Sequence, residues 1–178
     1  HGDYGAHVNQ AGFDSVTQYE LWKSIWSSLN DANFHELDWT LTRHNEFLDT
    51  FVPMTFIGNH DVTRIASMLT NPDHVEHALA VLMTTGGTPS IYAGDESAYR
   101  GVKEERFGGD DAVRPEFDSP HKGVGEHGVQ VYRAHQHLIG LRRRHPWLHT
   151  ARTTPLHVTN HGYVYAARNG DHTLVVAL

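Results

Sequence analysis

The hydrophobic residues follow a helical period along most of the chain. Apolar side chains recur on one helical face over residues 19–29, 36–50, 74–85 and 129–144, and this spacing predicts four amphipathic helices. Residues 63–69 are expected to form a shorter helix. The apolar pattern therefore predicts a chain rich in helices that each bury one face.

Short apolar runs that precede these helices predict strands. Residues 13–17, 51–57 and 88–93 have the length and side chains of strands, and a Gly or a helical pattern follows each run. A repeated strand–helix order favours parallel strands joined by crossover helices. Residues 1–12 contain three glycines and are expected to form a loop.

The period changes from helical to alternating after residue 150. Two β-prone runs flank Asn169-Gly170, a dipeptide typical of a tight β-hairpin turn. Residues 97–128 are polar, rich in glycine and longer than an ordinary connection, which is typical of a functional or elaborated loop. We therefore expect an α/β part over residues 1–149 and antiparallel strands over residues 150–178.

Composition narrows the classes of protein and of partner. The 178 residues are 39% hydrophobic and 20% charged, which is typical of a globular protein. The formal charge of −7 argues against nucleic acid as a partner, and no apolar stretch has the roughly 20 residues that cross a membrane. The absence of cysteine and of a visible signal peptide slightly favours the cytoplasm. The chain starts with His1 rather than Met, so we expect it to be a piece of a longer protein.

The sixteen histidines do not form a recognisable metal motif. His74 and His77, and likewise His135 and His137, lack an identifiable third ligand, and the sequence HExxH is absent. Without cysteine there are no thiolate ligands either. We therefore expect neither a metal site nor a cofactor in this chain.

Polar groups gather where two predicted strands end. Asn59-His60-Asp61 follow the run at 51–57, and Asp95-Glu96 follow the run at 88–93. In α/β barrels, catalytic groups lie where the strands end. A carboxylate that accepts and an imidazole that donates can bind adjacent sugar hydroxyls. A purely structural interpretation is that Asp61 caps the helix at 63–69 and pairs with Arg64.

Three stretches in order resemble a known family. FIGNHDVTR (56–64) resembles the fourth sequence signature of the α-amylase family, glycoside hydrolase family 13. GGTPSIYAGDE (86–96) is similar to its segment around the eighth barrel strand, and GGDDAVRPEF (108–117) to the acidic loop that follows. The resemblance implies an α/β fold: about the last three β/α units of a (β/α)8 TIM barrel, followed by the first antiparallel strands of a β-sandwich domain C.

The resemblance also implies roles for the residues of the first stretch. Asp61 matches the family's third catalytic carboxylate, which binds sugar hydroxyls and stabilises the transition state. His60 matches its neighbour, a hydrogen-bond donor to the same sugar. Asn59 and Arg64 lie within the motif and are expected to bind substrate, although Arg64 could instead pair with a local acid. The expected substrate is an α-glucan or α-glucoside, in a retaining hydrolysis or transglycosylation.

The chain departs from the family in one major respect. The family uses an Asp nucleophile and a Glu acid/base, which lie about 5–5.5 Å apart in retaining glycosidases, and the motifs of both are absent here. We therefore expect the isolated chain to be inactive and to associate with itself or with a missing barrel half. Calcium is possible in the longer protein. The alternative interpretation is a non-catalytic amylase-like scaffold or interaction protein.

Overall fold

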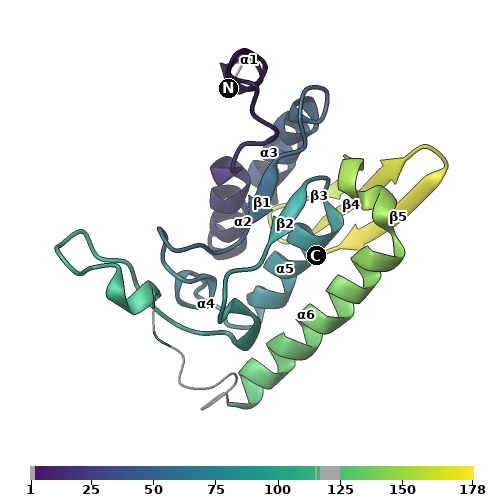
Figure 1. The fold of residues 1–178 in the computed structure, drawn as a ribbon. Coiled ribbons are helices and arrows are strands. Elements are labelled where there is room, and N and C mark those ends of the chain that lie inside the picture. The colour runs from purple at the N-terminus through teal and green to yellow at the C-terminus, as the bar shows by residue number, and fades with distance from the viewer. Residues whose placement is uncertain (1–2, 115, 117–124) are drawn as a thin grey trace.

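Helices and short strands alternate through most of the chain, and three antiparallel strands follow at its C-terminal end (Figure 1). The computed structural model describes residues 3–114, 116 and 125–178. None of the helices in these ranges is long and apolar enough to cross a membrane. The helices are α1 (Asp3–Ala11), α2 (Tyr19–Asp31), α3 (Phe34–Phe47), α4 (Ile65–Met68), α5 (His74–Thr84) and α6 (Glu126–Arg144).

Two short parallel strands form the first sheet. β1 (Met54–Phe56) pairs with β2 (Thr88–Ser90), and α4 and α5 form the crossover between them. The expected strand at 13–17 is reduced to one parallel bridge between Thr17 and Met54. The parallel arrangement predicted from the strand–helix order is thus confirmed, although each strand is shorter than its apolar run.

The second sheet is antiparallel, with the strand order β3 (Arg152–Val158), β4 (Tyr163–Asn169), β5 (His172–Ala177). Asn169 pairs with His172 across the turn between β4 and β5. Gly170 in this turn has φ of 55°, a conformation that glycine adopts without strain. The hairpin predicted from Asn169-Gly170 is confirmed.

One core joins the helices to the second sheet. The side chains of Tyr163 and Tyr165 on β4 are fully buried in the same cluster as α2, α3 and α5. The Tyr165 hydroxyl lies 2.5 Å from Thr84 Oγ1 at the end of α5, and the Tyr163 hydroxyl donates to Asp38 Oδ1 on α3. These bonds give both buried hydroxyls a partner, as buried polar groups require.

The expected loop at 1–12 is wrong over most of its length, because Asp3–Ala11 form the helix α1. Gly12, with φ of 68°, ends the helix. The ring of Tyr4 packs edge-on against Phe47, with the ring centroids 6.0 Å apart, and Val8 is buried. Packing against α3 thus favours the helix at a place where local glycine content favoured a loop.

Arg142 on α6 connects that helix to the C-terminal end of α5. Its guanidinium donates to the carbonyls of Met83, Thr85 and Gly87 over distances of 2.6–2.9 Å. The last carbonyls of a helix have no partner within the helix, so Arg142 satisfies groups that α5 leaves open. Burial lowers the pKa of Arg142 to about 10, and the side chain therefore stays charged at neutral pH.

Candidate active site

The turn at residues 58–64 follows the C-terminal end of β1 and carries the predicted site residues. The Asp61 N–H donates to Asn59 Oδ1 over 2.8 Å, which closes a local turn. Asn59 Nδ2 donates to the hydroxyl of Tyr19, 3.1 Å away at the start of α2. His60 and Asp61 are exposed, whereas Gly58 before them is buried. The turn thus presents an imidazole and a carboxylate to solvent from a buried strand end.

The Asp61 carboxylate lies between the side chains of His60 and Arg114. His60 Nε2 lies 3.3 Å from Asp61 Oδ2, and Arg114 Nη2 lies 2.9 Å from Asp61 Oδ1. Arg114 Nε also donates to the His60 carbonyl over 2.8 Å. The Asp61 side chain is still 46% exposed, so a ligand can reach it. The structure therefore brings His60 and Asp61 together in one accessible cluster.

Arg114 is a further member of this cluster. It lies in the third stretch that resembles the family, GGDDAVRPEF. Its Nη2 contacts Asp110 Oδ2 at 2.9 Å, and Lys103 Nζ lies 3.3 Å from Asp110 Oδ1. Arg114 thus joins the loop at 101–114 to Asp61. Pro115 and Phe117 of the same stretch lie outside the described residues.

Arg64 does not join the exposed cluster. Its side chain is 1% exposed and pairs with Asp95, with Nη1 2.9 Å from Oδ1. The acid with which Arg64 was expected to pair, if it did not bind substrate, is therefore Asp95. The capping interpretation of Asp61 is wrong, because α4 begins after Arg64 without a side-chain cap and Asp61 pairs with Arg114. Substrate binding by Arg64 stays a prediction, and the burial of its side chain disfavours direct contact.

Asp95 has the electrostatics of a buried acid. Burial raises the pKa of Asp95 to about 6, and the hydrogen bond and charge of Arg64 oppose that rise. Its Oδ1 accepts from Arg64, whereas Oδ2 has no hydrogen-bond partner within the described part of the chain. Asp95 is therefore ionised at neutral pH and gains a proton in mildly acidic solution.

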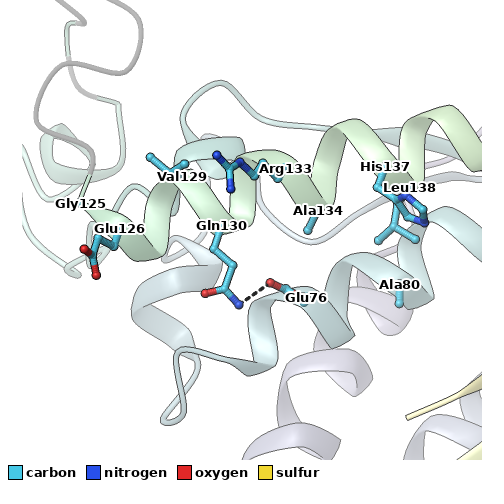
Figure 2. Close-up of a pocket in the computed structure, with 10 residues that line it drawn as sticks. All are labelled: Glu76, Ala80, Gly125, Glu126, Val129, Gln130, Arg133, Ala134, His137 and Leu138. Atoms are coloured by element: carbon cyan, nitrogen blue, oxygen red, sulfur yellow. Dashed lines mark hydrogen bonds between the residues drawn. The ribbon is translucent and has the colours of Figure 1, made fainter.

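A metal site or a surface groove away from Asp61 could also bind a ligand. Within residues 3–114, 116 and 125–178, no group of three or more His, Asp or Glu side chains could hold a metal ion. A groove of about 970 Å³ lies between α5 and α6, where Gln130 donates to Glu76 over 2.9 Å (Figure 2). None of the predicted site residues lines this groove, so it is separate from the cluster around Asp61.

The family model described as alpha amylase, catalytic domain, matches residues 6–155. The chain is 33% identical over 139 residues to a cyclomaltodextrin glucanotransferase of Geobacillus stearothermophilus, which covers 78% of this chain and 18% of that protein. It is 29% identical over 125 residues to an alpha-amylase of Niallia circulans, which covers 70% of this chain and 22% of that protein. The chain thus spans less than a quarter of either relative.

Solved structures match almost the whole chain. CldA, a cyclomaltodextrin glucanotransferase with a three-domain ABC distribution, superposes with a TM-score of 0.77 at 29% identity, over 99% of this chain and 35% of its own. An alpha-amylase from H. orenii superposes with a TM-score of 0.80 at 19% identity, over 98% of this chain and 40% of its own. At that identity the second match shows the fold alone.

Proposed function

The chain belongs to the alpha-amylase catalytic-domain family, and we propose that it forms part of a glycosidase or transglycosylase that acts on α-glucans. Residues 1–149 are assigned to about the last three β/α units of the (β/α)8 barrel, and residues 150–178 to the first strands of domain C. The change from a parallel to an antiparallel sheet supports a boundary near residue 150. The family model extends slightly further, to residue 155.

Asp61 is proposed as the carboxylate that stabilises the transition state. The observation that carries this assignment is its contact with His60 and Arg114 in an accessible cluster at the end of β1. Arg114 holds one carboxylate oxygen, and the carboxylate has further lone pairs that can accept from sugar hydroxyls. His60, 62% exposed, donates to the same sugar. Hydrogen bonds to an ionised group are stronger than neutral ones, so this pair suits a sugar at which charge develops.

Asn59 is proposed as a further contact of the sugar, beside Asp61. Its side chain is already bound to the Asp61 N–H and to Tyr19, and the amide has remaining donor and acceptor capacity. Calcium is proposed for the longer protein only. No residue of this chain is assigned to a metal or to a cofactor.

Bond cleavage needs groups that this chain is not proposed to contain. A retaining glycosidase uses a nucleophile and an acid/base, with their carboxyl groups about 5–5.5 Å apart. Asp61 has neither role in this assignment, and transition-state stabilisation alone forms no covalent intermediate. We therefore expect no turnover of an activated α-glucoside by the purified 178-residue polypeptide. Turnover above that of a buffer blank would contradict this expectation.

Sugar binding tests the assignment of Asp61 directly. Maltotriose is titrated into the isotope-labelled polypeptide while the backbone amides of His60 and Asp61 are followed by NMR. Saturable shifts are expected in the wild type and in the control Asp73→Asn, an exposed acid before α5. At least a tenfold weaker affinity is expected for Asp61→Asn. Equal affinities for maltotriose and the β-linked cellotriose, or no effect of Asp61→Asn, would count against an α-glucan site here.

A further partner is proposed for the first sheet. β2 pairs with β1, and Thr17 adjoins β1 on the other side. Strand edges that are left open favour association, so a further strand from the remaining barrel, or a second copy of this chain, is proposed to lie beside β2.

A further inference from the structure

The buried pair of Arg64 and Asp95 lies next to the turn that carries Asp61. Both side chains are 1% exposed. Arg64 Nη1 donates to the Ala93 carbonyl over 2.7 Å as well as to Asp95. The guanidinium also lies on the ring of Tyr92, 4.1 Å from its centroid. A cation with this many fixed contacts holds the segment after β2 against the turn after β1.

The second oxygen of Asp95 rests on the backbone of this turn. A Cβ added to Gly58 would lie 2.0 Å from Asp95 Oδ2, closer than any real contact, so only glycine leaves room for the carboxylate. Gly58 immediately precedes Asn59-His60-Asp61. The place of the Asp95 side chain therefore limits where the backbone of that tripeptide can lie.

Arg64 reaches Asp61 by a second route, through the loop at 101–114. Arg64 Nε donates to the Val113 carbonyl over 3.1 Å, and the Arg64 N–H donates to the Gly101 carbonyl over 3.0 Å. These bonds fix both ends of the loop. Arg114 follows Val113 and pairs with Asp61. The Arg64 guanidinium thus contacts Asp95, which lies against Gly58 in the turn that carries Asp61. It also contacts Val113, the neighbour of Arg114, and Arg114 orients the Asp61 carboxylate.

From these contacts we infer that Arg64 and Asp95 are positioning residues for Asp61, which hold the turn at 58–61 through Gly58 and through Arg114. The inference rests on the proposed role of Asp61 for its functional meaning. Ionised Asp95 balances the buried charge of Arg64, and removal of the carboxylate in Asp95→Asn leaves that charge without a counterion, which is costly in the interior. Loss of the Asp95 carboxylate is therefore expected to loosen the turn at 58–61.

Other ionisable groups face this pair from the neighbouring elements. Glu96 follows Asp95 in a short 3-10 helix, Asp95–Ser97, and its charge opposes the ionisation of Asp95. His135 of α6 is buried and feels the charge of Glu96, but burial lowers the pKa of His135. Tyr99 lies near the Arg64 guanidinium, 5.3 Å from ring centroid to Cζ. The pKa of about 6 for Asp95 places its protonation within a range in which the protein can be studied.

The experiment is an NMR pH titration of the 178-residue chain from pH 7.5 to 5. It follows the Gly58 amide and the Arg64 Nε–H, and every variant carries His60→Gln, which removes the imidazole beside Asp61. Both signals are expected to shift with one midpoint near pH 6 in the chain that retains Asp95 and in the control Asp73→Asn. Neither is expected to titrate in Asp95→Asn. Unchanged titration of both signals in Asp95→Asn would overturn the inference.

Amide exchange measures the positioning itself. At pH 7.5, exchange at residues 59–61 is expected to be at least tenfold faster in Asp95→Asn than in Asp73→Asn. Equal exchange rates in the two folded variants would overturn the positioning role. Because these signals are read without sugar, a failure to bind maltotriose would refute the proposed function and leave this test unaffected.

A pair of glycine variants covers the case in which Asp95→Asn does not fold. Gly58→Ala places a methyl group against Asp95 Oδ2, whereas Gly125→Ala meets nothing within 4 Å. Gly58→Ala is expected to shift the Arg64 Nε–H and to raise exchange at 59–61 at least tenfold above Gly125→Ala. A folded Gly58→Ala variant that matches Gly125→Ala in both readouts would refute the contact on which the inference depends.

Discussion

Arg114 and Asp61, 53 residues apart in the sequence, meet with Arg114 Nη2 2.9 Å from Asp61 Oδ1. The same nitrogen contacts Asp110 Oδ2 at 2.9 Å. One cation therefore holds the carboxylate of the proposed site to the acidic loop that follows the second strand. The side chains of the pair are partly exposed, at 43% for Arg114 and 46% for Asp61. This exposure determines how much stability the protein should lose when the ion pair is removed.

Replacement of Arg114 should weaken sugar binding more than stability. Exposed ion pairs contribute about 0–1 kcal/mol, so Arg114→Ala is expected to change the free energy of unfolding by about 1 kcal/mol or less in urea. The Asp61 carboxylate loses its fixed orientation, so maltotriose affinity should fall at least fivefold. Arg143→Ala, an exposed arginine of α6, is the control and should change neither quantity. A large loss of stability with unchanged affinity would contradict the proposed role.

Arg142 should contribute far more to stability than its neighbours on α6. Arg142→Met removes the donor to three carbonyls at the end of α5, and a hydrogen bond to a charged group contributes about 1.5–3 kcal/mol net of the bonds to water that it replaces. We expect a loss of about 2–4 kcal/mol in the free energy of unfolding, measured in urea. Arg142→Lys should recover part of this loss, and Arg143→Ala should cost little. Equal stabilities of Arg142→Met and Arg143→Ala would refute this capping role.

The elements predicted correctly are those whose signals are local. The apolar stripe predicted α2, and Asn169-Gly170 predicted the hairpin of β4 and β5. A period in the side chains, or a dipeptide suited to one turn, is sufficient for such elements. The helix α1 was missed because its stabilising contact, between Tyr4 and Phe47, crosses to another helix.

The part of the proposed site that could be predicted from the sequence consists of residues that are adjacent along the chain. Asn59-His60-Asp61 are adjacent in sequence, so any fold that ends a strand at Gly58 keeps them together. The partner of Arg64 is Asp95, 31 residues away, and the partner of Asp61 is Arg114, so neither pairing follows from spacing. Several acids were available to each arginine, and only the tertiary fold selects among them.

Buried His44 should make the protein less stable in acid. Its Nε2 lies 2.8 Å from the Gly86 carbonyl and its Nδ1 lies 3.4 Å from Gln18 Nε2. Burial lowers the pKa of His44 below its ordinary 6.5, against the Gly86 hydrogen bond, which raises it. Below about pH 6.5 the unfolded chain therefore binds a proton that the folded chain does not, so the free energy of unfolding falls as pH falls.

The comparison that isolates this effect is wild type against His44→Gln in urea at pH 7.5 and pH 5. His44→Gln should be less stable at pH 7.5 but should lose less stability between the two values. Asp95, with its raised pKa, takes up a proton in the folded state and acts in the opposite direction. His135 acts in the same direction as His44. Both are present in the two proteins and cancel in the difference, so equal losses would contradict a neutral, buried His44.

Association through the first sheet should depend on protein concentration. The Thr88 N–H donates to the Pro53 carbonyl beside β1, so the next residue, Pro89, faces the open edge of β2 and offers a carbonyl without an N–H. The missing N–H weakens hydrogen bonding at the open edge of β2, although carbonyl acceptors remain there. In the same sheet, Met54 on β1 has an apolar side chain that is 38% exposed. We expect sedimentation velocity to show a mass that rises above 20.0 kDa between 5 and 100 µM. Met54→Lys should raise the dissociation constant at least tenfold, whereas Val175→Lys, on the second sheet and 58% exposed, should not. A monomer at every concentration would refute self-association and leave the remaining barrel as the proposed partner of this edge.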